Sequence, residues 1–336
     1  MAEGRARQQH QILQLTVRGR LAIAAAALLI AGSAAAQESY PSKPIKLYVG
    51  FTAGGGTDYV ARVIADKMFE GAGRSAVVEN RPGASGIIAA DATVRAAPDG
   101  YSLMFAPTGV ITVNPATHAN LSYAPQRDFI AVAQAVTFPC ILAVNKALPV
   151  ASVSDLVAWA KANPAQANQG GSGAAFQLIA KLFQKHTGAS FEYIQYKSTG
   201  ESTAALITGE IAMSLVDSGP LSGAIKNNQV RGLAVSSAKR LSAFPDLPTL
   251  TEAGMPGFEV ELWMGLFAPA GTPDLIVRKL EAEIIRIVKL PDVQEKLRAH
   301  EVEPAGIEGA RFARMIAAET ERYAAIAREF NIRVGQ

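Results

Sequence analysis

The sequence predicts an α/β protein with largely parallel sheets, and three observations lead to that fold class. Apolar, β-rich runs alternate with amphipathic stretches through most of the chain, as in proteins built from βαβ units. Several of these runs end in short loops of glycine, serine or threonine that lead directly into a helical pattern. Hydrophobic residues make up 49% of the 336 residues and charged residues 18%, which is typical of a folded globular protein and excludes disorder.

The first expected elements follow the order strand, glycine loop, helix. Residues 45–51 form a mostly apolar run, which predicts a buried strand. A glycine-rich loop separates this strand from an amphipathic stretch at 57–69, which predicts a helix. The same order then repeats, with a strand expected at 76–79, a helix at 86–96 and a strand at 101–106.

The middle of the chain continues the alternation of strands and helices. Two strands are expected at 129–136 and 141–145, with Pro139 interrupting the run between them. Ser152 and Asp155 form a capping-box start for a helix that reaches residue 162 and stops at Asn163-Pro164. Further strands are expected at 191–195, 211–216 and 230–236, with helices between them.

The last third of the chain has longer helical patterns. Residues 244–250 predict a loop and residues 258–268 an extended segment. Thr272 and Pro273 supply an N-cap and a first-turn proline for a helix running to about residue 289. Two further helices are expected, one after Leu290-Pro291 and a long one at 308–330.

The N-terminal segment has the pattern of an export signal. Residues 1–36 combine four arginines and one acid with an apolar run at 21–32 and small residues at 33–36. The alternative is a membrane anchor, but the apolar run is short for a bilayer span. We expect cleavage after Ala36 and a soluble exported product, residues 37–336. Without that segment the numbers of basic and acidic residues are equal, so nothing indicates a nucleic-acid partner.

The sequence lacks the complete sets of side chains that most enzyme classes require. Cys140 is the one cysteine, so no internal disulfide is possible, and we expect it to act as a small apolar residue in a strand. Neither a metal-ligand spacing of histidines nor a complete hydrolase motif occurs, since Gly170-Gly-Ser-Gly-Ala174 lacks the last glycine of Gly-x-Ser-x-Gly. Asp58 stands where a phosphate-binding loop needs lysine, and Tyr59 where a dinucleotide loop needs glycine. The sequence predicts no catalytic residue, no metal and no cofactor.

The loop Thr52-Ala-Gly-Gly-Gly-Thr-Asp58 is the strongest candidate for a binding site. Its glycines let the backbone approach a ligand, and the free N–H groups at the start of a helix favour an anion. Asp58 is expected to accept backbone N–H bonds that hold the loop open and rigid. The loop alone leaves a second interpretation open, namely a tight turn without a ligand.

Other loops at strand ends have the same character. Because ligands in open α/β sheets bind beyond the carboxyl ends of strands, these loops could line one cleft. Several helix starts facing one space would favour an anionic group without a catalytic side chain. The loops are residues 80–86, 106–109, 170–173, 196–200 and 217–220.

A series of short motifs resembles one family of receptors, the Bug-type solute-binding proteins of tripartite tricarboxylate transporters. The resemblance spans residues 40–330, with the motifs in the family's order after an export signal. The matching motifs include Phe51-x-x-Gly-Gly-x-x-Asp58, Val78-Glu-Asn-Arg-Pro-Gly-Ala-x-Gly86, Ala97-Pro-Asp-Gly-Tyr-Ser-Leu103, Tyr196-Lys197, Pro245-Asp-Leu-Pro-Thr-Leu-x-Glu-Ala-Gly254 and Trp263-x-Gly-Leu-x-Ala-Pro-Ala-Gly-Thr-Pro273.

The resemblance implies a type II periplasmic-binding-protein fold, in which two α/β lobes close on a ligand between them. It implies one domain from residues 37–138 and 262–336 and a second from 139–261. Family members hold a small carboxylate through backbone N–H groups, hydroxyls and waters. Carried over by position, the resemblance implies the ligand-binding residues Ala53, Gly54, Gly55, Gly56, Thr57, Asp58, Thr108, Ser172, Gly173, Ala174, Tyr196 and Asp217.

The second domain departs from the family pattern. Ala174 and Ala175 stand where relatives often have serine or threonine, and Gln177 replaces a frequent histidine. Together with Phe176, these residues suggest a less polar wall on that side of the ligand.

The favoured function is therefore an exported, periplasmic receptor for a small organic anion, such as a dicarboxylate, a tricarboxylate, an acidic amino acid or an aromatic acid. Its expected partners are that ligand and a membrane permease, or a sensor kinase, with the receptor itself a monomer. An enzyme on a similar fold is the alternative, because Tyr196, Lys197 and Asp217 are chemically able to serve as a reactive group. A structural surface protein is a third possibility, and it predicts no tight small ligand.

Overall fold

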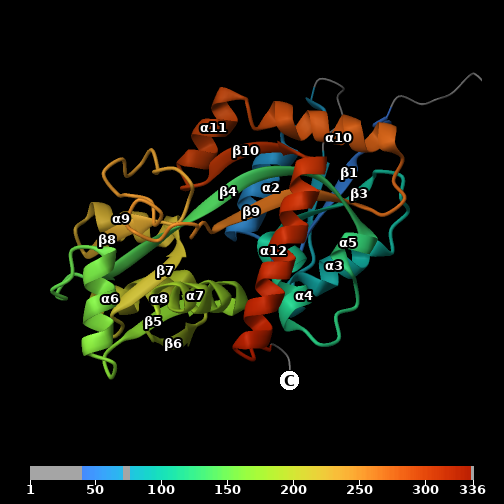
Figure 1. Cartoon of the computed structure of the whole chain (residues 1–336). Helices are drawn as coiled ribbons and strands as arrows, with labels where there is room; N and C mark the ends of the chain where they lie inside the picture. The colour runs from blue at the N-terminus through green and yellow to red at the C-terminus, as the bar shows by residue number, and fades with distance from the viewer. Residues whose placement is uncertain (1–39, 71–75, 334–336) are drawn as a thin grey trace, which may run out of the picture. The chain divides into compact units, whose positions relative to one another are not determined.

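One sheet runs through the structure, and a single long strand carries it across both halves (Figure 1). The computed structural model describes residues 40–70 and 76–333, so the predicted export signal lies outside the described residues. The chain divides between Ser42 and Lys43, and the helices and strands of the described residues belong to the part from Lys43 onward. Among the residues described, no helix is long and apolar enough to cross a membrane.

Ten strands within the described residues form the sheet. Their order is β2-β1-β3-β9-β4-β7-β5-β6, and β8 and β10 also pair with β4. The strands are β1 (Ile45–Val49), β2 (Ala76–Asn80), β3 (Ser102–Pro107), β4 (Phe129–Asn145), β5 (Asn168–Ser172), β6 (Glu192–Tyr196), β7 (Met213–Asp217), β8 (Val230–Val235), β9 (Glu261–Pro269) and β10 (Glu303–Glu308).

Strand β4 belongs to both halves of the sheet. Its first part pairs with β9 and β10, and its second part pairs with β7 and β8. Pro139 is the last residue opposite β9, and Cys140 is the first opposite β7. The prediction of two strands interrupted at Pro139 is therefore wrong. The missing proline N–H falls where β4 changes partners, so the 17-residue strand continues through it.

The expectation of largely parallel sheets holds only for the outer strands. Strands β1, β2 and β3 are parallel to one another, as are β5, β6 and β7. The strands that connect the two halves pair antiparallel with their neighbours, which makes the sheet mixed. The reason is geometric, since β4 and β9 carry the chain across the molecule in opposite directions.

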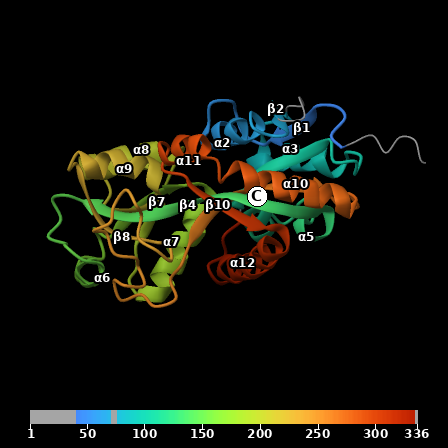
Figure 2. The same ribbon diagram turned by 90° about the horizontal axis from the view of Figure 1, so that it is seen from above.

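Helices flank the sheet on both sides. In Figure 2, α2 (Gly56–Ala65) and α11 (Pro291–Arg298) lie on one side of β4, and α12 (Gly309–Glu329) lies on the other. The remaining helices are α3 (Ile87–Val94), α4 (Asn114–Thr117), α5 (Pro125–Asp128), α6 (Val153–Ala162), α7 (Gly173–Thr187), α8 (Thr199–Thr208), α9 (Ser218–Lys226) and α10 (Asp274–Ile287), with short helical turns at Ala84–Gly86 and Gly109–Val113. The predicted capping box is confirmed, because the Asp155 amide donates to the Ser152 hydroxyl at 3.1 Å.

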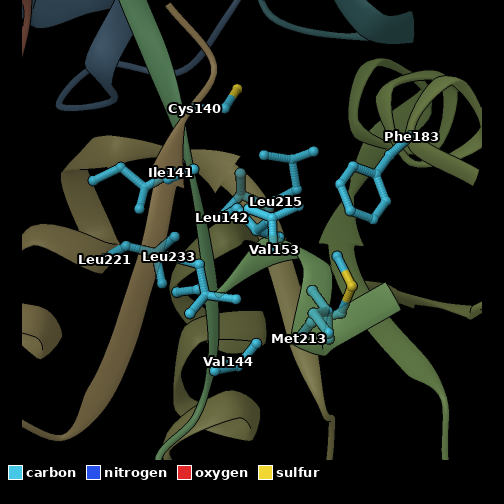
Figure 3. Close-up of a cluster of buried hydrophobic side chains, with 14 of the residues drawn as sticks. Cys140, Ile141, Leu142, Val144, Val153, Phe183, Met213, Leu215, Leu221 and Leu233 are labelled. Atoms are coloured by element: carbon cyan, nitrogen blue, oxygen red, sulfur yellow. The ribbon is translucent and has the colours of Figure 1, made fainter. Parts of the chain in front are cut away.

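The core of the second half forms around the end of β4. Figure 3 shows Leu142 and Val144 of β4 beside Met213 of β7 and Phe183 of α7. Cys140 belongs to this cluster and is fully buried, as expected of a small apolar residue, and burial raises the pKa of its thiol. The cysteine is therefore a packing residue.

Strand β5 is an element that the sequence pattern did not predict. Its sequence, Asn-Gln-Gly-Gly-Ser, contains no apolar side chain that would indicate a strand. The two glycines are required by packing, since a Cβ on Gly170 would lie 2.5 Å from Ile211 Cδ1 and one on Gly171 would lie 2.8 Å from the Tyr193 hydroxyl. Strand β10 was also missed.

Candidate functional site

The first glycine loop is held in place by Asp58, as predicted. The Gly54 amide donates to Asp58 Oδ2 at 2.8 Å, and Gly54 has a φ of +82°, a conformation that favours glycine. Ala53, Gly54 and Gly56 lie toward solvent, whereas Thr57 and Asp58 are buried. No side chain caps α2, whose N-cap is Gly55, so the start of this helix presents backbone N–H groups.

Two further side chains complete the support of Asp58. Arg62 Nε donates to Asp58 Oδ2 at 3.0 Å, and Asn80 Nδ2 donates to Oδ1 at 2.8 Å. Asn80 also donates to the carbonyl of Phe51, which ties the loop to strand β2. Sequence reasoning gave these two residues no such role, although the spacing of Asp58 and Arg62, four residues apart in a helix, is a usable signal for an ion pair.

The pKa of Asp58 reflects this arrangement. Burial raises the pKa, but the hydrogen bonds from Arg62, Gly54 and Asn80 outweigh that effect and hold it below its usual range. Asp58 is therefore ionised at neutral pH. Its charge is paired with Arg62 inside the first lobe.

Thr108 positions the chain instead of offering a free hydroxyl. It is buried, and its Oγ1 accepts from the Trp263 amide at 2.8 Å and donates to the Trp263 carbonyl at 3.2 Å. This pair of bonds fixes the start of the turn at Gly109–Val113 against β9. The resemblance implied a ligand contact from Thr108. In the structure the Thr108 side chain also holds the turn at Gly109–Val113 against β9.

The second-half loop ends at the start of α7. Ser172 is the N-cap of this helix but makes no capping bond with its side chain, and Gly173 has a φ of +71° with open space where a Cβ would lie. Ala174 and Ala175 pack against an apolar cluster that includes Val113 and Tyr323. The structure therefore brings the first turn of α7 beside the turn that follows Thr108.

Ala174, Ala175 and Phe176, which were expected to form an apolar wall beside the ligand, pack against other parts of the protein. Phe176 lies in the hydrophobic core of the second half, next to Gly171 of β5. The alanines at 174 and 175 serve the packing between α7 and α12. The two alanines therefore join α7 to the first half, whereas Phe176 packs within the second half alone.

Tyr196 and Asp217 also have partners inside the second half. The Tyr196 hydroxyl donates to Glu210 at 2.8 Å, and burial together with this bond raises the pKa of Tyr196 to about 12. Asp217 ends β7 opposite Cys140 and precedes α9. Burial raises the pKa of Asp217, and a hydrogen bond from Thr199 opposes that rise. A carboxyl group whose pKa is raised repels an anionic ligand less than an ordinary aspartate does.

The two cations near the loops do not form a clamp. Arg81 bonds to Glu79 at 2.6 Å and lies over the ring of Tyr48, with 4.3 Å between the guanidinium carbon and the ring centroid. Arg81 is therefore engaged by Glu79 and Tyr48 within the first lobe. Lys197 is exposed, and its backbone amide donates to Glu201.

None of the predicted ligand-binding residues lines the two cavities at the crossover strands β4 and β9. These cavities, of about 360 and 570 Å³, are bounded instead by residues of β9, of α12 and of the segment 237–242. Sequence reasoning did not single out either cavity.

Comparison with known proteins identifies the family. The model of the tripartite tricarboxylate transporter family receptor matches residues 60–332. The protein BugT of Bordetella pertussis is 32% identical over 316 residues, which cover 92% of this chain and 96% of BugT.

Solved structures show the same fold. Rpa4515 of R. palustris, solved with adipate, is 32% identical with a TM-score of 0.74 and covers 88% of this chain and 99% of its own. MatC of Rhodopseudomonas palustris, with bound malate, is 29% identical with a TM-score of 0.71, covering 85% and 99%. The periplasmic binding protein BugD is 28% identical with a TM-score of 0.72, covering 88% and 99%. The predicted two-lobed periplasmic-binding-protein fold is confirmed.

Proposed function

Because the chain belongs to the tripartite tricarboxylate transporter receptor family, we propose that it captures a small organic carboxylate between its two lobes and delivers it to a membrane permease. The family is one of solute receptors and not of enzymes, which favours the receptor over the enzyme alternative. Adipate and malate are the ligands named for two relatives of known structure, and a dicarboxylate is the class we propose for this chain.

The observation that carries this proposal is the first glycine loop. Its backbone is exposed, leads into an uncapped helix start and is held by a buried aspartate whose own charge is paired with Arg62. Free N–H groups at a helix start bind carboxylates well because the helix dipole adds to their hydrogen bonds. The proposed ligand-binding set remains the one implied by the family, with Thr108 and Asp58 acting by holding the loops in position.

The remaining parts of the proposal concern location and assembly. We propose export with cleavage after Ala36, a periplasmic location and a monomeric receptor. We also propose one domain from residues 37–138 and 262–336 and another from 139–261. The change of partners in β4 between Pro139 and Cys140 and the start of β9 at Glu261 support that division.

Calorimetric titration of the purified protein with adipate and with malate tests the proposal. We expect saturable binding of at least one of them, and an unchanged ligand after long incubation, whereas conversion of the ligand would favour the enzyme alternative. Asp58→Ala should weaken binding about tenfold or more, because the Gly54 amide loses its anchor. Asp66→Ala removes the same charge from the end of the same helix without touching the loop, and it should leave affinity unchanged. Tighter binding by the Asp58 variant, with the fold intact, would contradict the role given to the loop.

A further inference from the structure

A cavity of about 360 Å³ lies between α12 and the crossover strands. We call it the hinge cavity, because β4 and β9 connect the two lobes beside it. In Figure 1, α12 passes in front of β9 in this region. Its polar walls are Gln134 of β4, Glu259 and Glu261 at the start of β9, and Glu319 and Arg322 of α12.

The charges around the hinge cavity do not balance. Three carboxylates face one guanidinium, and Arg322 already donates to the Glu259 carbonyl at 3.1 Å and lies 3.8 Å from Glu319. No salt bridge among residues 40–70 and 76–333 involves Glu259 or Glu261. The cavity therefore favours a positive charge.

Gln134 provides a second, independent indication of a ligand. Its side chain is fully buried and lines the cavity, and neither its amide nitrogen nor its amide oxygen has a hydrogen-bond partner among the described residues. Buried polar atoms are nearly always hydrogen-bonded, because leaving them unpaired is costly. A guest with N–H donors would supply the partner that the amide oxygen of Gln134 lacks.

The chemistry of the walls narrows the class of guest. Met315, Ala318 and Trp263 give the cavity an apolar side. Among the described residues, no cluster of carboxylates, histidines or cysteines is arranged to hold a metal ion. Burial raises the pKa of Glu261, and the neighbouring Glu259 adds to the effect, as expected of carboxylates that lack a counter-charge.

We propose that the hinge cavity binds a small primary ammonium ion with a short apolar chain, independently of the carboxylate site. An ammonium group has three N–H donors and no acceptor, which suits Glu259, Glu261 and the amide oxygen of Gln134. The apolar chain would lie against Met315 and Trp263.

Calorimetric titration of the full protein with n-butylammonium at about pH 8 tests the proposal. We expect saturable binding of one ion per chain with a Kd of about 1 mM or tighter, and no binding of 1-butanol or butyrate. Glu259→Gln, at an exposed position that tolerates change, and Glu261→Gln should each weaken binding about tenfold. Glu321→Gln removes an exposed charge from α12 outside the cavity and should leave affinity unchanged.

Gln134→Met keeps the length of the side chain and removes the unpartnered amide. It should weaken n-butylammonium binding while leaving the melting temperature unchanged or higher, since a buried unpaired polar group is removed. Equal binding of 1-butanol, equal affinity of the Glu261 and Glu321 variants, or no saturable heat at all would overturn the proposal. The last result would mean that water alone fills the cavity.

Discussion

Replacing Glu319 with glutamine should remove one specific source of pH-dependent stability. The carboxyl group of Glu319 lies on α12 with 11% of its side chain exposed, and it accepts a hydrogen bond from the indole N–H of Trp263 at 2.8 Å. Burial raises its pKa from 4.5 to about 7, although Trp263, Arg322, Thr112 and Tyr323 oppose the rise. Glutamine keeps an oxygen for the indole and carries no titrating proton.

The size and sign of the effect follow from that pKa. A carboxyl group with a raised pKa holds its proton more tightly in the folded chain than in the unfolded chain. Its contribution to stability is therefore fully present below about pH 4.5 and is lost as pH rises toward 7. A shift from 4.5 to about 7 corresponds to about 3 kcal/mol of unfolding free energy. The stability of the wild type relative to Glu319→Gln should fall by about that amount between about pH 4 and pH 8.

Urea unfolding at a series of pH values, followed by tryptophan fluorescence, measures the difference. Comparing the wild type with the variant cancels the other titrating groups, including Glu261 and Asp217. Glu321→Gln, an exposed change on the same helix, serves as the control and should run parallel to the wild type. A Glu319 variant whose stability also runs parallel to the wild type across this range would refute the argument from burial.

Three other predictions concern the carboxylate site and the export signal. Gly55→Val should reduce ligand affinity more than tenfold, because even a Cβ at this position lies 3.3 Å from the Thr52 carbonyl oxygen. Arg81→Ala should change affinity little, because its guanidinium is engaged by Glu79. Calorimetry on both variants checks this prediction, and a collapse of affinity in the Arg81 variant would contradict it. A saturating dicarboxylate should raise the unfolding free energy by about 2.7 kcal/mol at 100 times Kd and compact the protein, which denaturation and small-angle scattering would detect. N-terminal sequencing of the exported protein should find Gln37 as the first residue, and retention of Met1 would show that the signal-peptide prediction is wrong.

Local signals were sufficient for many elements of the fold. Helix starts could be predicted where a capping residue is present, as at Ser152. The predicted N-cap Thr272 and first-turn Pro273 were wrong by one residue, because α10 begins at Asp274 with Pro273 as its N-cap and the Thr272 hydroxyl donates to the Pro269 carbonyl. Strands could be predicted where a mostly apolar run is largely buried, as in β1 and β7. The anchoring of the first loop by Asp58 could also be predicted, because Gly54 and Asp58 are only four residues apart at the start of α2.

Features that depend on distant partners could not be predicted. The glycines of β5 are explained only by Ile211 and Tyr193, which come from other elements. The use of the Thr108 hydroxyl depends on Trp263, which is 155 residues further along the chain. The hinge cavity likewise combines side chains from β4, β9 and α12, and no short stretch of sequence contains its pattern.

The partner change within β4 has a consequence for how the protein could be divided. Because one strand supplies an inner position to each half of the sheet, cutting the chain between the lobes would expose an unpaired strand edge on both fragments. Such edges invite aggregation. Neither lobe is therefore an independent building block that could be recombined with a foreign partner, and ligand specificity in this scaffold is better redesigned by exchanging loops than by exchanging lobes.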